Sequence, residues 1–105
     1  MKDVWVKILN DLLKGSKELP TTPKTNKAPV WFLASTDGEK IYINEAVENK
    51  PSSNLKSRRV LTYKNFEDIY PIHLRRESGE KVSKEATDAT RNQVYYFSLI
   101  NHLGK

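Results

Sequence analysis

The chain has 105 residues, no cysteine and a formal net charge of +5. Its length favours one domain over residues 1–105 with a single modest core. The lack of cysteine excludes disulfides, thiolate metal sites and a cysteine nucleophile, and it fits a reducing compartment. No apolar run approaches the roughly 20 residues that span a bilayer. We therefore expect a cytoplasmic protein with no membrane partner.

The N-terminal segment has the pattern of an amphipathic helix. Asp3 suits the positive end of the helix dipole, and Gly15 is a natural stop, so the helix is predicted over 3–14. The apolar residues with helical spacing are Trp5, Ile8, Leu9, Leu12 and Leu13.

Residues 16–29 contain three prolines and mostly polar side chains, which predicts an irregular connector. Such a connector allows two arrangements of the first helix. Either the helix packs on its own chain, or it swaps onto a second copy in a homodimer.

Two β-rich runs flank Asp37-Gly38, which is a strong hairpin signal, and predict strands near 30–35 and 40–44. A two-residue turn at these positions pairs Ala34 with Ile41. One face of the hairpin is then apolar and carries Val30, Phe32, Ala34, Ile41 and Ile43. The other face carries Trp31, Leu33, Ser35, Lys40, Tyr42 and Asn44. That second face is either an aromatic platform for a base or a peptide, or a surface covered by a second layer, which we favour.

The polar stretch 45–57 predicts a long loop. A third strand is expected at 58–63. Asn65 can cap a short helical turn over 66–69, which Pro71 would end. A fourth strand is then expected at 72–76.

Ser83 is a suitable N-cap for a helix over 84–103 that ends at Gly104. The alternative ends this helix near Asn92 and makes 94–100 a strand, because Val, Tyr and Phe favour strands. We choose the helix. The predicted fold class is α+β, with a small antiparallel sheet of three to four strands and an N-terminal and a C-terminal helix packed on it.

The most informative segment is 49–76, which is rich in cations and has aromatic residues between them. Arginine binds phosphate through a planar fork, and aromatic rings can stack on bases, so this composition favours a surface for nucleic acid. The alternative is a solvated surface with a surplus of charge. Consecutive strand residues point to opposite faces, so we expect a band of cations and no single pocket. The cations are Lys50, Lys56, Arg58, Arg59, Lys64, Arg75 and Arg76.

Three residues of the last predicted helix, Arg91, Asn92 and Gln93, are of the types that read guanine and adenine edges in a major groove. An ordinary solvated helix face explains them equally simply, and we favour that interpretation.

The two histidines, His73 and His102, are far apart in sequence and neither has a second histidine at helical spacing, and glycine-rich phosphate loops are absent. No metal or cofactor is therefore expected. His73, Glu67 and Arg75 supply the residue types that a small metal-independent ribonuclease needs.

The sequence favours binding over catalysis. The hypothesis is a nucleic-acid-binding protein that contacts the phosphate backbone, with duplex DNA preferred to RNA. The alternatives are a protein-interaction module or inhibitor that uses the aromatic hairpin face, an acidic protein surface as the partner of the cations, and the ribonuclease.

Overall fold

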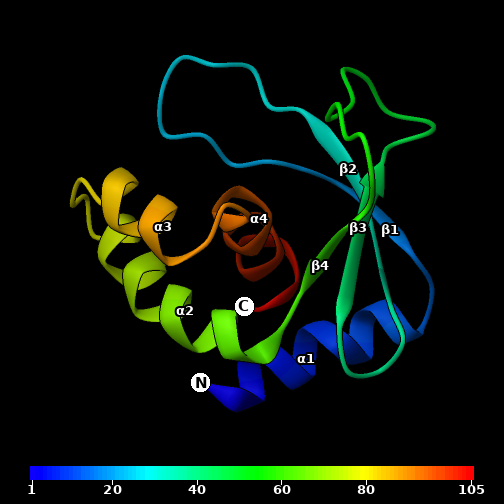
Figure 1. Ribbon diagram of the computed structural model, residues 1–105, viewed down its shortest axis with the longest axis horizontal. Coiled ribbons are helices and arrows are strands. Elements are labelled where there is room, and N and C mark those ends of the chain that lie inside the picture. Colours follow the sequence, from blue (N-terminus) through cyan, green and yellow to red (C-terminus); the bar gives the residue numbers. More distant parts are fainter.

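The computed structural model describes every residue from Met1 to Lys105. Four helices pack against a four-stranded antiparallel sheet, which confirms the predicted α+β class (Figure 1). The strands are adjacent in chain order, β1-β2-β3-β4. The elements in chain order are α1 (Lys2–Leu13), β1 (Lys17–Pro20), β2 (Trp31–Thr36), β3 (Ile41–Glu45), β4 (Arg59–Leu61), α2 (Tyr63–Glu77), α3 (Ser83–Ala89) and α4 (Gln93–Leu103).

The loop between β2 and β3 is longer than predicted and spans residues 37–40. Asp37 Oδ1 accepts hydrogen bonds from the backbone amides two and three residues further on, at 2.9 and 2.8 Å. Ala34 therefore pairs with Ile43 and not with Ile41. The register differs from the expected one by two residues, an even number, so every side chain stays on its predicted face.

The inner face of the hairpin is the core face, as predicted: Phe32, Ala34, Ile41 and Ile43 are 0% exposed. One cluster of buried apolar residues joins this face to all four helices. The outer residues Trp31, Leu33 and Tyr42 are only half-buried. The interpretation that a second layer covers this face was wrong, because the helices meet the sheet through the inner face alone.

Strand β1 lies inside the segment that was predicted to be an irregular connector. Leu19, the only large apolar residue of that segment, pairs with Phe32 and is 9% exposed. Burial of this one side chain aligns four residues on the sheet edge. The remaining residues, 21–30, form an irregular loop that we call the strap.

The predicted strand at 72–76 and the short turn at 66–69 were both wrong. Helix α2 runs through Pro71, which is exposed. Thr62 and not Asn65 is the N-cap, and its side chain accepts from the Asn65 amide at 3.4 Å. Three buried positions at helical spacing outweigh the proline: Phe66, Ile69 and His73.

The predicted continuous helix over 84–103 is interrupted at residues 90–92. Thr90 is extended, with φ −163° and ψ 144°, and separates α3 from α4. Residues 94–100 are helical, as predicted, and α4 is the central helix of the core. Its six consecutive buried residues, 95–100, contact the sheet on one side and the other helices on the other.

Helix α1 packs on its own chain, which is the first of the two predicted arrangements. The Trp5 ring lies 5.1 Å from the Phe66 ring, centroid to centroid. None of the helices has the length and apolar character needed to cross a bilayer.

Candidate nucleic-acid interface

The loop 46–58, which carries three of the seven predicted cations, is held at one end by a carboxylate. Glu18 of β1 accepts hydrogen bonds from the backbone amides of Val47, Glu48 and Asn49 at 2.6, 3.0 and 2.9 Å. These donors lower the pKa of Glu18 to about 2. The carboxylate thus satisfies three consecutive loop amides, next to the buried side chain of Ala46.

The same loop is tied to β2 and to α4. Trp31 donates its amide to the Pro51 carbonyl at 2.8 Å, and its own carbonyl accepts from the Ser53 amide at 2.7 Å. The Ser53 hydroxyl lies 2.6 Å from the Tyr95 hydroxyl of α4. The backbone of the loop is therefore held in place at residues 47–53 although it contains no helix or strand.

Four cations project from this loop and from the start of β4, and we call them the basic strip: Lys50, Lys56, Arg58 and Arg59. All four are exposed, and none forms a salt bridge with a carboxylate. The Arg58 guanidinium lies over the Tyr42 ring, 4.3 Å from its centroid. Arg59 Nη1 donates to Asn92 Oδ1 at 3.0 Å. The two arginines thus lie on opposite sides of the sheet edge, as strand alternation predicts.

The other three predicted cations lie on α2 and do not join the basic strip. Lys64 is exposed in the first turn of that helix. Arg75 forms two hydrogen bonds with Glu85, at 2.6 and 2.8 Å, and one with Glu80 at 3.2 Å. Arg76 points under the strap. The seven predicted cations are therefore divided between two parts of the molecule.

The predicted base-reading residues lie at the turn between α3 and α4 and not on one helix face. Arg91 is exposed, while the side-chain oxygen Oδ1 of Asn92 accepts a hydrogen bond from Arg59. The Gln93 amide lies 3.2 Å from the Thr87 hydroxyl. The structure brings Asn92 to the basic strip, but the helix face that the sequence suggested is not formed, because the helix breaks at Thr90.

The residues of the hypothetical ribonuclease site do not converge. His73 is 2% exposed, with its ring 5.7 Å from that of Phe97, and burial lowers its pKa to about 4. Arg75 reaches the carboxylates of Glu80 and Glu85 instead. His73 is therefore a core residue, and nothing holds it beside Arg75.

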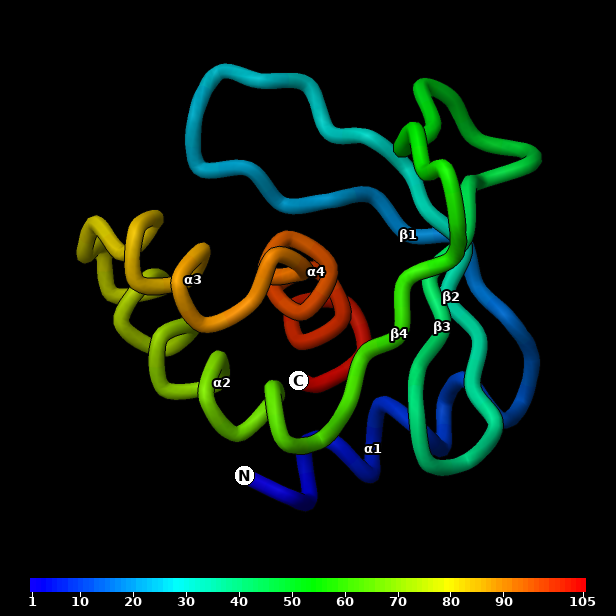
Figure 2. The backbone as a smooth tube through the Cα atoms, in the orientation of Figure 1, coloured from blue at the N-terminus to red at the C-terminus, as the bar shows by residue number.

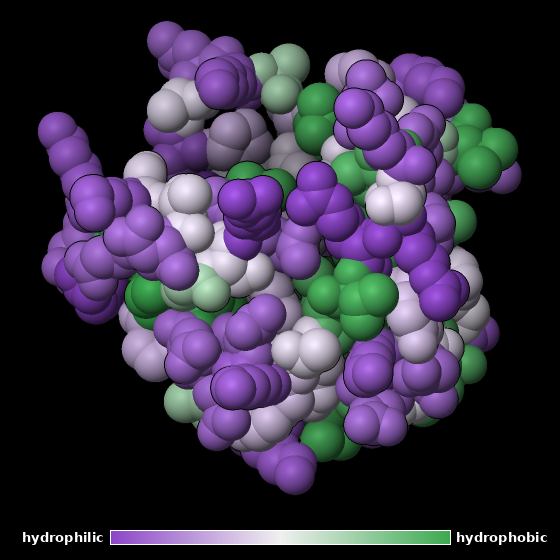
Figure 3. All heavy atoms as spheres, in the orientation of Figure 1, coloured by the Kyte–Doolittle hydropathy of each residue, from purple (hydrophilic) through white to green (hydrophobic).

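No group of three or more His, Asp or Glu side chains is placed to hold a metal ion. Figure 3 shows hydrophilic residues over most of one face of the molecule, with apolar residues in separate patches. Comparison with protein-family models, with curated proteins and with solved structures found no match.

Two arrangements were not foreseen from the sequence. One is the cap of Glu18 on the loop 46–58, which joins residues about 30 positions apart. The other is the position of Arg76 over the Phe97 ring, 4.4 Å from its centroid. Neither arrangement is marked by a local sequence pattern, since each depends on how distant segments of the chain pack together.

Proposed function

We propose that this chain is a nucleic-acid-binding protein that holds the phosphate backbone, of duplex DNA in preference to RNA, with the basic strip. The proposal rests on the exposure, the pairing and the attachment of these four cations. They are exposed, they lack carboxylate partners, and they extend from a loop that is fixed by Glu18 and Tyr95. Uncompensated cations displace counterions from a polyanion, which supplies most of the affinity for a nucleic acid backbone.

The rings of α2 and the Tyr42 ring are not open for base stacking, which favours a duplex over a single strand; the half-buried Trp31 beside the loop is the exception. Single-strand binders stack bases on exposed aromatic rings. Here Phe66 is buried in the core, and Tyr63 and Tyr70 of the same helix pack against that core. The Tyr42 ring is covered by Arg58. Phosphate contacts position a protein on DNA without reading its sequence, so we expect weak sequence preference.

The first test removes the charge of the strip without changing the charge of other surfaces. Replacing Lys50, Lys56, Arg58 and Arg59 by glutamine should weaken binding of a fluorescein-labelled duplex at low salt by roughly a hundredfold or more. Fluorescence anisotropy measures the affinity.

The matched control makes the same change in net charge elsewhere, by replacing Lys2, Lys7, Lys14 and Lys40 with glutamine. We expect this variant to bind within about threefold of the unaltered protein, because only screened long-range attraction is lost. Equal losses in the two variants would show that net charge, and not the strip, attracts the duplex.

A further inference from the structure

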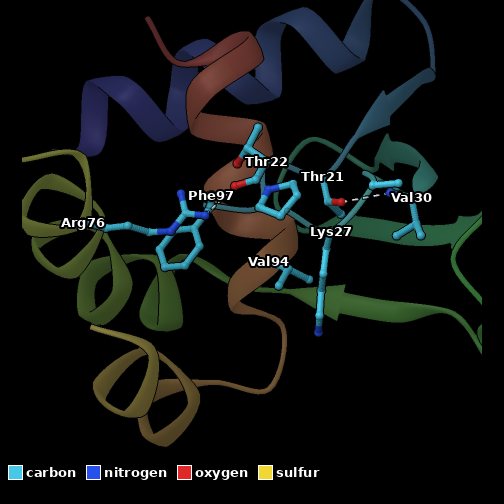
Figure 4. Close-up of a pocket in the computed structure, with 9 residues that line it drawn as sticks. Thr21, Thr22, Lys27, Val30, Arg76, Val94 and Phe97 are labelled. Atoms are coloured by element: carbon cyan, nitrogen blue, oxygen red, sulfur yellow. Dashed lines mark hydrogen bonds between the residues drawn. The ribbon is translucent and has the colours of Figure 1, made fainter. Parts of the chain in front are cut away.

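A cleft lies between the strap, α2 and α4, on another part of the molecule from the basic strip (Figure 4). Its inner part is a cavity of about 210 Å³ whose walls include Thr21, Thr22, Lys27, Arg76, Val94 and Phe97. A wider cavity of about 810 Å³ shares Arg76, Val94 and Phe97 with it and opens toward α3. We call the two together the strap cleft.

Arg76 is the charged residue common to both cavities. Its guanidinium stacks over the Phe97 ring at 4.4 Å, and one terminal nitrogen donates to the Thr22 carbonyl. The other terminal nitrogen, Nη1, is buried and has no hydrogen-bond acceptor. Unlike the neighbouring Arg75, this residue forms no salt bridge. A half-buried cation without an anion is unfavourable, because burial removes its water and nothing replaces it.

The other charges of the cleft leave this cation uncompensated. The inner cavity contains Lys27 and Arg76 and no carboxylate. In the wider cavity, Glu77 forms a salt bridge with Lys24 at 3.0 Å, and Glu80 forms one with Arg75 at 3.2 Å. The inner cavity is therefore positive, and its apolar wall of Val94 and Phe97 lies beside the charge.

We propose that the strap cleft binds a small organic anion, a carboxylate or a phosphate monoester that carries an apolar ring or chain. The anionic group accepts from Arg76 and is approached by Lys27, while the apolar part packs on Val94 and Phe97. The inner cavity is smaller than the roughly 300–1,000 Å³ of sites for drug-sized ligands, so the ligand is small. Charge-assisted bonds to a guanidinium give such an anion both affinity and orientation.

Nη1 is buried, so an anion reaches this nitrogen only when a neighbouring segment such as the strap shifts. Near Arg76 the strap is held by the bond to the Thr22 carbonyl, by the bond from Asn101 Nδ2 to the Thr22 hydroxyl at 3.2 Å and by the Lys24–Glu77 salt bridge. The strap contains no helix or strand, so a shift of Thr22 breaks no backbone ladder. An entering anion takes the place of the Thr22 carbonyl as the acceptor for Nη2 and accepts from Nη1 as well.

The test is a titration of the isotopically labelled chain with phenyl phosphate, followed by amide chemical shifts. Saturable shifts are expected in the strap and at residues 93–97. Benzyl alcohol, which has the ring without the charge, and inorganic phosphate, which has the charge without the ring, should each bind about tenfold more weakly or worse. Equal binding of either compound, or no saturable shift with phenyl phosphate, overturns the proposal.

Variants locate the site. Arg76→Met keeps the apolar stem and should weaken phenyl phosphate binding tenfold or more, while Arg76→Lys should lose less. Lys14→Met, on the exposed end of α1, should leave the affinity within about twofold. If Arg76→Met does not fold, Lys27→Met provides the test, since Lys27 is exposed and a severalfold loss is expected. Unchanged affinity in the folded Arg76→Met protein, or in Lys27→Met where that variant replaces it, contradicts the assignment.

A parallel titration with benzoate identifies the anionic group. Tighter binding of benzoate than of phenyl phosphate assigns a carboxylate ligand, and the reverse assigns a phosphate monoester. The proposal stands independently of nucleic-acid binding, because its readout is the shift of strap residues and requires no duplex.

Discussion

Two side chains of α2 that resemble functional groups in sequence, His73 and Arg76, are enclosed by the fold. His73 is 2% exposed and its Nδ1 has no hydrogen-bond partner. Glu77 lies 3.7 Å from its Nε2, an attraction that opposes but does not cancel the effect of burial. The imidazole is therefore neutral at pH 7, and protonating it disfavours the native state.

This burial predicts a pH dependence of stability. The native pKa of His73, about 4, lies below the ordinary value of 6.5, so the unfolded chain binds a proton that the native state does not. The contribution of the buried, neutral His73 ring to the free energy of unfolding is complete above pH 6.5 and is lost as the pH falls toward 4. Between pH 7 and pH 5 the free energy of unfolding should fall by about 2 kcal/mol.

Urea unfolding at the two pH values measures this change. His73→Gln should remove most of the dependence, whereas His102→Gln, at the exposed second histidine, should retain it. A dependence that persists undiminished in His73→Gln would contradict the burial of a neutral imidazole.

Glu18 supplies a second prediction at the scale of one residue. Its depressed pKa means that its contribution to stability is present above pH 4.5 and is lost as the pH falls toward 2. At pH 7, Glu18→Gln should speed hydrogen exchange of the amides at residues 47–49 by roughly tenfold, since the charged acceptor is lost. Glu48→Gln, which makes the same charge change in the loop itself, should have no such effect; similar exchange in both variants would refute the cap.

At the scale of elements, α2 is the segment in which local and tertiary signals disagree. Pro71 lacks the amide that would continue the helical ladder, yet the helix extends six residues beyond it to Glu77. The burial of Ile69 and His73 on its inner side holds the helix together through this position.

Pro71→Ala should therefore raise the free energy of unfolding by about 1 kcal/mol, because alanine restores a helical hydrogen bond at an exposed position. Part of the gain is offset by the greater freedom of the unfolded chain. Thermal unfolding followed by circular dichroism measures the change. Pro23→Ala, in the strap, should bring no gain, and a loss of stability in Pro71→Ala would argue against a continuous α2.

The sequence predicted the elements whose signals are local. The spacing in α1 and the alternation in the hairpin each specify one buried face, and both were confirmed. Strand β1 was missed because one buried side chain, Leu19, decides it. The predicted strand at 72–76 is wrong, because burial at helical spacing on either side of Pro71 outweighs the helix-breaking effect of the proline.

The candidate site was predictable only in part, because contacts between distant segments leave no local pattern in the sequence. The run of cations at 50–59 is visible in the sequence, but its attachment to Glu18 and Tyr95 depends on packing between distant segments. The contact between Arg59 and Asn92 joins two predicted groups that are 33 residues apart. Arg76 could not be distinguished from Arg75 by sequence, although one lies in a cleft and the other in exposed salt bridges.

At the scale of the whole molecule, the order of the strands places both long loops at the same end of the sheet. The strap connects β1 to β2, and the loop 46–58 connects β3 to β4, while the turn 37–40 lies at the opposite end (Figure 2). Lys27, Lys50, Lys56 and Arg58 on these loops have no carboxylate partner, whereas Arg75 and Lys84 of the helical half are paired with carboxylates.

The salt dependence of duplex binding tests the basic strip most directly. Four phosphate contacts predict that the logarithm of the association constant falls with the logarithm of salt concentration with a slope of about −3 to −4. Replacing the four strip residues by glutamine should bring the slope close to zero, and the charge-matched control should keep it. Absence of salt-sensitive binding by the unaltered protein at low ionic strength would contradict the account.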